Sequence, residues 1–202
     1  MKVNIKSLLF LLIVLVSLNA CQNNASYTPK PRAYPKVDFP ERAYQSFVGN
    51  SCSFTFDYPV YTNINKEKNY EENAPVHPCW FNVHFPDFNG DIYVTYYEIG
   101  SPKSLDRLAK DAFELVDYHN KKANYIDEFL VDRPDSEVYG YAFNIEGPSA
   151  SPFQFFVTDS VKHFVRGSIY FNTKTRPDSI APISEFVKAD ALKLIESLEW
   201  SE

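Results

Sequence analysis

Two cysteines in strand-like stretches restrict the fold more than any other feature of this sequence. Cys52 and Cys79 each begin a run in which every second residue is apolar. Residues at i, i+2 and i+4 lie on one face of a β-strand, so both sulfurs are expected to point into the core. The pattern predicts two neighbouring strands that the cysteines can bridge. The apolar residues in phase are Phe54 and Phe56 after Cys52, and Phe81, Val83 and Phe85 after Cys79.

The start of the chain indicates the compartment in which these cysteines fold. Two lysines precede an apolar run from Leu8 to Leu18, which is followed by Asn19-Ala20-Cys21. At about eleven residues the run is shorter than the roughly 20 needed to span a bilayer, and its flanks are typical of an export signal. Ala20-Cys21 resembles the lipidation site of bacterial lipoproteins, although Asn19 departs from the small or branched residue usual there. We expect a lipoprotein signal peptide over residues 1–20 and lipidation of Cys21; the alternative is a secreted protein with a free Cys21.

Lipidation would anchor the protein to a membrane that the polypeptide itself does not cross. Buried acyl chains, palmitate among them, contribute about 0.8 kcal/mol per methylene, so several chains attach a protein durably. Gln22-Asn23-Asn24, directly after the cysteine, contains no acidic residue. Some lineages send lipoproteins to the cell surface through an acidic run at this place. By analogy with them, we expect an outer-membrane protein that faces the periplasm.

The charge of the chain excludes nucleic acid as a partner. There are 20 Lys and Arg against 26 Asp and Glu, and loss of residues 1–20 removes Lys2 and Lys6, which leaves 18 against 26 and a net charge of −8. Nucleic-acid binding depends on neutralising phosphates with basic side chains. An acidic body equally disfavours adhesion to anionic lipid, so the expected membrane contact is the N-terminal lipid.

In an oxidising periplasm the two remaining cysteines are expected to form a disulfide. Closing a loop of about 27 residues contributes roughly 3.5 kcal/mol on chain-entropy grounds. The competing interpretation is a zinc site made by Cys52, Cys79, His77 and His84, since thiolate and imidazole are ordinary zinc ligands. His84 lies on the opposite strand face from Cys79, and no Cys-x-x-Cys pair is present. The disulfide is therefore favoured, and no metal or other cofactor is expected.

The remaining sequence alternates strand and helix patterns. Asn89-Gly90 predicts the turn of a hairpin from Cys79 to Tyr97. Ser101-Pro102 is typical of a helix start, and apolar residues at helical spacing continue to about Asn120. Gly167, inside the last expected strand, indicates a bulge or a close backbone approach. Further strands are expected over residues 126–131, 137–145, 153–158 and 163–171, and a second helix, after Pro182, has an apolar stripe from Ile183 to Leu198.

These elements predict an α+β fold with a single antiparallel sheet of about six strands and helices packed on it. The order of elements is similar to the α/β/α-type sandwich of the PsbP and Mog1 families, an analogy of fold that says little about activity. We expect three parts in the chain: the signal peptide over residues 1–20, a lipidated Pro-rich tether over 21–45, and the sandwich domain over 46–202.

Motifs for catalysis are absent from the sequence. It contains no Gly-x-Ser-x-Gly, no His-Glu-x-x-His and no phosphate-binding glycine loop. Glu71-Glu72 or Asp132 with Asp135 could form a carboxylate dyad for cleaving sugars, but they fall in charged, turn-like stretches that favour solvated surface. His119 is expected at a helix C-terminus, where a cation interacts favourably with the helix dipole. We expect no catalytic residues and no enzyme. A periplasmic hydrolase or glycan binder is the alternative, and it would need a pocket with convergent carboxylates or histidines.

Aromatic residues are concentrated on the expected strands. Alternation places Tyr93 and Tyr97 on one strand face and Tyr96 on the other. Core packing explains most of these side chains. If helices leave part of one sheet face uncovered, however, exposed aromatics there would form a binding surface, because Tyr, Trp and Phe are enriched at interfaces.

A proline-rich, aromatic strip, Tyr27 to Tyr44, follows the expected lipidation site. Its prolines favour the extended polyproline II form, which rises about 3.1 Å per residue. Two interpretations stay open: Val37, Phe39 and Tyr44 dock the tether onto the domain, or the strip is itself a recognition segment in the manner of proline-rich ligands. The candidate partner-binding residues are Tyr27, Lys30, Pro31, Arg32, Tyr34 and Phe39.

Seven strings in a fixed order carry a resemblance to a known family. They are TPKPRAY (28–34), VDFP (37–40), CSFTFDYP (52–59), CWFN (79–82), GPSASPFQF (147–155), FVRGSIYFN (164–172) and RPDSIAP (176–182). Together they extend over almost the whole mature chain and resemble the gliding-motility lipoprotein GldD family of the Bacteroidota. The resemblance implies a membrane-anchored, non-catalytic accessory protein needed for gliding and for type IX secretion. Its implied partners are other envelope proteins of that machinery, and the family offers no established catalytic residues to carry over.

Overall fold

The computed structural model describes residues 36–49, 52–66, 77–100, 103–174 and 176–201. The predicted signal peptide, the lipidated Cys21 and the candidate partner-binding residues Tyr27, Lys30, Pro31, Arg32 and Tyr34 lie outside the described residues. The acidic pair Glu71-Glu72 lies outside them as well.

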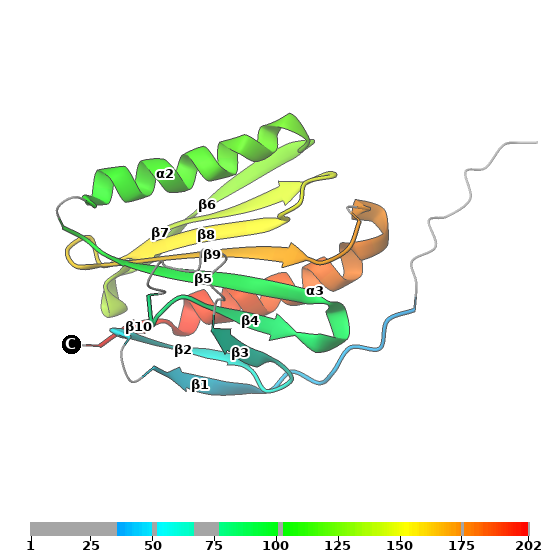
Figure 1. Cartoon of the computed structure of the whole chain (residues 1–202), viewed down its shortest axis with the longest axis horizontal. Helices are drawn as coiled ribbons and strands as arrows, with labels where there is room; N and C mark the ends of the chain where they lie inside the picture. The colour runs from blue at the N-terminus through cyan, green and yellow to red at the C-terminus, as the bar shows by residue number, and fades with distance from the viewer. Residues whose placement is uncertain (1–35, 50–51, 67–76, 101–102, 175, 202) are drawn as a thin grey trace, which may run out of the picture. The chain divides into compact units, whose positions relative to one another are not determined.

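Two antiparallel sheets and two α-helices make up the described domain (Figure 1). The large sheet has the strand order β3-β4-β5-β9-β8-β7-β6, and the small sheet has the order β1-β2-β10. The strands are β1 (Tyr44–Val48), β2 (Phe54–Pro59), β3 (Asn63–Lys66), β4 (Phe81–Phe85), β5 (Gly90–Glu98), β6 (Tyr125–Arg133), β7 (Val138–Glu146), β8 (Phe153–Thr158), β9 (His163–Phe171) and β10 (Glu199–Trp200). The helices are α2 (Leu105–Asp117) and α3 (Pro177–Ser197), with short 3₁₀ turns η1 (Pro86–Phe88), η2 (Tyr118–Lys121) and η3 (Pro134–Ser136).

The predicted α+β class is confirmed, but the single six-stranded sheet is wrong in number. The described residues form seven strands in the large sheet and three in a second sheet. The additional strands are short: β1 has five residues, β3 has four and β10 has two. Such lengths hold too few residues for an alternating pattern to be recognised.

Both helices begin elsewhere than expected. Ser104 is the N-cap of α2, and its Oγ accepts a hydrogen bond from the backbone N–H of Arg107 at 3.4 Å. Helix α3 begins at Pro177, so Pro182 lies inside the helix rather than before it. Pro177 occupies the first helical position, where a missing backbone N–H costs nothing. Pro182, inside the helix, lacks the N–H that would donate to the helical hydrogen-bond ladder.

The helices cover opposite faces of the large sheet (Figure 1). In β7, β8 and β9, buried residues on the two faces belong to two separate cores. On β8, Phe155 packs in the core shared with α3 and the small sheet, whereas Phe156 packs in the core under α2. We call these the α3 face and the α2 face. The predicted alternation on β5 is confirmed, since Tyr96 is 2% exposed in the α3-face core while Tyr93 and Tyr97 are half-buried on the other face.

A disulfide joins Cys52 to Cys79, with the two Cα atoms 5.5 Å apart. The cysteines precede β2 and β4, which belong to different sheets, so the bridge connects the small sheet to the large one rather than two neighbouring strands. With the sulfurs bonded to each other, neither is available as a thiolate ligand for zinc. Gly167 marks a close approach and not a bulge: the pairing of β9 is continuous, and a Cβ added there would lie 2.2 Å from the Phe155 ring.

Candidate functional site

Helix α2 covers only part of the α2 face. Its buried residues Leu108, Ala112 and Val116 pack on the β7–β9 side of the sheet, against a cluster that contains Phe143 and Phe156. Beside the helix, six half-buried side chains of β5 and β9 form a polar and aromatic floor that no helix of the described chain covers. We call this floor, with the flank of α2 that borders it, the tyrosine–arginine groove. The floor residues are Tyr93, Thr95, Tyr97, Arg166, Ser168 and Tyr170.

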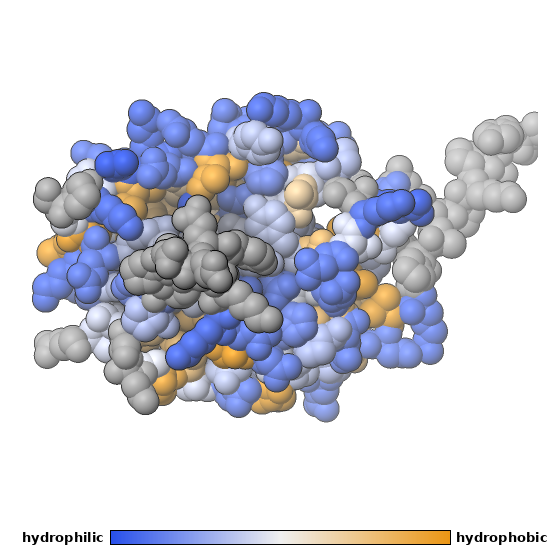
Figure 2. Space-filling view, viewed as in Figure 1, coloured by the Kyte–Doolittle hydropathy of each residue, from blue (hydrophilic) through white to orange (hydrophobic). Residues whose placement is uncertain are grey.

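The groove contains two adjoining cavities, and Arg166 lines both. The larger, of about 470 Å³, lies beside the C-terminal half of α2 and is bordered by Leu115 and Tyr118. The smaller, of about 210 Å³, lies beside the N-terminal half and is bordered by Lys103 and Arg107. On the face seen in Figure 2, hydrophilic and intermediate residues predominate and hydrophobic residues form separate patches.

Arg166 is the central charge of the groove. It lies on β9, the middle strand of the large sheet, and its side chain is half-buried. Within the described residues, no hydrogen bond or ion pair is found for its guanidinium. Burial raises the pKa of the nearby Tyr170 hydroxyl, and the positive charge of Arg166 acts in the opposite direction. The environment of Arg166 is therefore partly desolvated and holds no described counter-charge in contact.

Two further cations lie at the N-terminal end of the groove. Lys103 Nζ lies 4.2 Å from the centroid of the Tyr97 ring, a cation–π contact. Arg107 follows one turn later on α2, and both side chains are exposed. Asp111 is the carboxylate among the described residues that line this cavity. The groove is thus a positively charged surface on a chain whose formal net charge is −6.

His119 closes the other end of the groove, and burial lowers its pKa, which disfavours the helix-capping cation expected from the sequence. The side chain of Gln154 lies 2.8 Å from His119 Nε2, and Ser149 Oγ lies 2.7 Å from Nδ1. If the Gln154 amide donates to Nε2, the proton of the ring is on Nδ1 and is donated to Ser149, whose hydroxyl donates to the Ser151 carbonyl at 3.1 Å. A histidine that donates to a serine cannot remove its proton, so this pair positions η2 against the loop before β8 and does not activate a nucleophile.

The other histidines have structural partners. His84 Nδ1 lies 2.8 Å from Asp91 Oδ1, and His163 Nδ1 lies 2.7 Å from the hydroxyl of Tyr96. The backbone N–H of Cys79 donates to His77 Nδ1 at 3.2 Å. Asp132 and Asp135, one of the two predicted carboxylate pairs, are both exposed, as solvated surface residues are.

Phe39, the one described member of the predicted partner-binding residues, docks onto α3. Its ring centroid lies 4.6 Å from that of Phe186 and 5.8 Å from that of Phe88, and the residue keeps 39% of its surface exposed. Nearby, Arg42 forms an ion pair with Asp190 and lies over the Phe186 ring. For residues 36–44, the docking interpretation is the one that the contacts favour.

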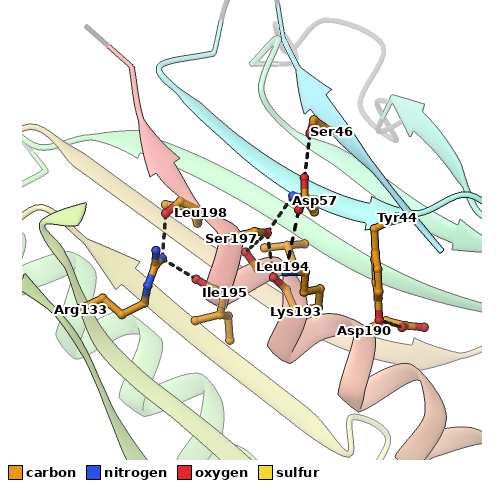
Figure 3. A network of polar contacts seen from close by, with 10 residues as sticks. All are labelled: Tyr44, Ser46, Asp57, Arg133, Asp190, Lys193, Leu194, Ile195, Ser197 and Leu198. Atoms are coloured by element: carbon orange, nitrogen blue, oxygen red, sulfur yellow. Dashed lines mark hydrogen bonds and ion pairs between the residues drawn. The ribbon is translucent and has the colours of Figure 1, made fainter. Parts of the chain in front are cut away.

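Asp190 holds this docked segment through a buried carboxylate whose side chain is fully inaccessible. The hydroxyls of Tyr44 and Tyr61 donate to it at 2.9 and 2.8 Å (Figure 3 shows the Tyr44 contact). Burial raises the pKa of Asp190, while these hydrogen bonds and the charge of Arg42 oppose the rise. Further along α3, Arg133 donates to the carbonyls of Ile195 and Leu198 at the end of the helix (Figure 3).

Strand alternation found the two tyrosines of β5, but sequence reasoning missed the cations of the groove. Arg166, Ser168 and Tyr170 occupy alternate positions on β9, opposite in phase to the buried Val165 and Ile169. Polar residues at alternate positions of a central strand were the sequence signal that could have indicated this site.

The fold and the groove define an α+β sandwich domain with one cleft-bearing sheet face. The chain belongs to the gliding motility lipoprotein GldD family, whose model matches residues 24–200. A search of curated proteins returned no match. Among solved structures, cyanobacterial PsbP (CyanoP) from Synechocystis sp. PCC 6803 is similar at 13% identity and a TM-score of 0.44, over 82% of this chain and 97% of that chain.

Membership of a lipoprotein family makes this a membrane-anchored protein of the cell envelope. Within the described part of the chain, no helix has the length and apolarity needed to cross a bilayer.

Proposed function

We propose that this protein is a non-catalytic accessory lipoprotein of the gliding motility and type IX secretion machinery, and that it acts by binding other envelope proteins of that machinery. Family membership supports the motility role. The tyrosine–arginine groove is the observation that carries the binding role, because tyrosine and arginine are the residues enriched at the energetic centres of protein interfaces.

The same proposal includes the way in which the protein is anchored to the membrane. Residues 1–20 are removed as a signal peptide, Cys21 is acylated, and residues 21–45 tether the domain of residues 46–202 to the outer membrane, facing the periplasm. The contacts of Phe39 and Arg42 with α3 support a tether whose last part is fixed to the domain.

A hydrolase is less well supported by the groove. Glycoside hydrolysis uses two carboxylates on either side of the bond to be cleaved. Of the described residues that line the two cavities, Asp111 is the one carboxylate. A glycan-binding protein is the remaining alternative, and binding of the purified protein to peptidoglycan or envelope polysaccharide would favour it.

Gene deletion with complementation tests the proposed function. Deletion should abolish secretion of type IX cargo and, in a host that glides, colony spreading. A plasmid copy should restore both, and a copy with Cys21→Ala should not. Normal secretion in the deletion strain would contradict the assignment to this machinery.

A further inference from the structure

In the middle of one sheet face lies an arginine to which the described residues offer no counter-charge, and this arrangement suggests a ligand. Charged groups removed from water are normally paired, because an unpaired one loses hydration without compensation. Arg166 is half-buried on the central strand, and the described residues supply no ion pair to its guanidinium. An anion that entered the groove would complete this arrangement.

The groove has a basic end and an aromatic end. Lys103 and Arg107 border the smaller cavity, whereas Leu115, Tyr118 and the β5 residue Tyr93 line the larger one, with Arg166 shared between them. From Arg107 to Tyr118 the helix rises about 16 Å at 1.5 Å per residue. An extended peptide covers that length in about five residues.

We propose that the tyrosine–arginine groove binds an extended acidic segment of a partner polypeptide. A Glu or Asp carboxylate of this segment pairs with Arg166, and an apolar or aromatic side chain a few residues away fills the larger cavity. This proposal rests on the proposed function and specifies the chemistry of the partner.

The single cation of the larger cavity matches the single charge of a carboxylate. The planar guanidinium of Arg166 matches a carboxylate in a bidentate pair. The larger cavity offers Arg166 as its one cation among the described lining residues, and the smaller cavity includes the carboxylate of Asp111.

Site-specific photo-crosslinking in intact envelopes tests the proposal. Leu115, which is 44% exposed and borders the groove, is replaced with p-benzoylphenylalanine, and Val60, 50% exposed in the loop after β2, receives the same change as a control. We expect a polypeptide adduct at Leu115 and none of the same mass at Val60. The crosslinked peptide, mapped by mass spectrometry, should contain Glu or Asp within about five residues of an apolar or aromatic side chain.

Variants of Arg166 decide whether the adduct depends on the proposed charge pair. Arg166→Gln should reduce the adduct at least tenfold, and Arg166→Lys, which keeps the charge without the bidentate geometry, should reduce it less. Lys110→Gln is the control for the loss of one positive charge. Lys110 is an exposed residue of α2 whose Nζ lies 3.7 Å from Glu114, and its replacement should leave the adduct unchanged. Because its guanidinium is not paired within the described structure, Arg166→Gln should not lower the melting temperature.

A synthetic copy of the mapped peptide gives the second measurement. It should bind the purified mature protein at least tenfold more weakly when its acidic residues are replaced by Gln, and inorganic phosphate at equal concentration should not displace it. An adduct unaffected by Arg166→Gln, a mapped segment without acidic residues, absence of any adduct at Leu115, or displacement by phosphate would each overturn the proposal. If deletion blocks secretion while Arg166→Gln complements fully, the accessory role stands and this inference fails.

Discussion

Replacing Arg42 with alanine should destabilise the domain, because it leaves the Asp190 carboxylate buried with fewer partners. The Asp190 side chain is fully inaccessible, and Arg42 provides its ion pair while Tyr44 and Tyr61 provide hydrogen bonds. Loss of one partner of a buried ion pair costs about 3–5 kcal/mol. Because Arg42 is itself 35% exposed and two hydroxyl donors remain, we expect about 2–3 kcal/mol.

Urea denaturation of the purified mature protein, followed by tryptophan fluorescence, measures this loss. The midpoint should fall with an unchanged slope, and for a chain of this size the melting temperature should fall by about 2–4 °C per kcal/mol. The double variant Arg42→Ala with Asp190→Asn should be more stable than additive single effects predict, since it removes the carboxylate that Arg42 neutralises. A loss below about 0.5 kcal/mol in Arg42→Ala would refute the view that Arg42 compensates the buried charge.

The pH dependence provides a second check. Burial raises the pKa of Asp190 in the folded state, so its titration contributes stability below the unfolded pKa that is lost as the pH rises through the folded pKa. Removal of Arg42 takes away a charge that lowers this pKa, so the pKa should rise further. The difference between wild type and Arg42→Ala should therefore be largest at neutral pH and shrink at acid pH. A difference that is constant across the range would contradict the role of the Asp190 charge.

Three further perturbations have expected outcomes. Gly167→Ala should cost about 1–3 kcal/mol, because its Cβ would overlap a phenyl ring, whereas Gly100→Ala, with no atom within 4 Å of the added carbon, should leave the urea midpoint nearly unchanged; equal effects would refute this packing argument. Burial lowers the pKa of His119, so the folded state binds its proton less readily, and stability should fall as the pH drops through the unfolded pKa; in His119→Gln this part of the pH dependence should vanish, and its persistence would assign it to another group. Replacing Cys52 and Cys79 together with Ala should lower the free energy of unfolding by roughly 3.5 kcal/mol, the chain-entropy value for the 27-residue separation; an unchanged urea midpoint would show that the bridge does not constrain the unfolded chain.

Strand alternation predicted most of the large sheet because its period is short and each strand carries its own pattern. It also placed Tyr93 and Tyr97 on one face, which is the floor of the groove. Alternation does not say which strands are neighbours: β5 pairs with β9 from a part of the chain some 70 residues away, as in the register of Tyr93 with Ser168. The position of Arg166 beside these tyrosines follows from that pairing and not from the local pattern of either strand.

The second sheet was missed for a different reason. The sequence places Cys52 in phase with buried residues, and this is correct for Phe54 and Phe56. Nothing in that pattern distinguishes a strand of the same sheet from a strand of a sheet packed against it. The expected bridge to Cys79 therefore predicted that the two strands lie close together, but not that they belong to different sheets.

The contacts of Phe39 and Arg42 with α3 have a mechanical consequence. If the protein is held at its N-terminus, a pull from the membrane enters the described part of the chain through Lys36 and is resisted by the Phe39–Phe186 stack and the Arg42–Asp190 ion pair. These contacts lie before Tyr44, where β1 begins and pairs with Pro59 of β2. An antiparallel pair pulled from its end opens one hydrogen bond at a time, so the docked segment transfers load to a long helix and spares β1 from being unzipped.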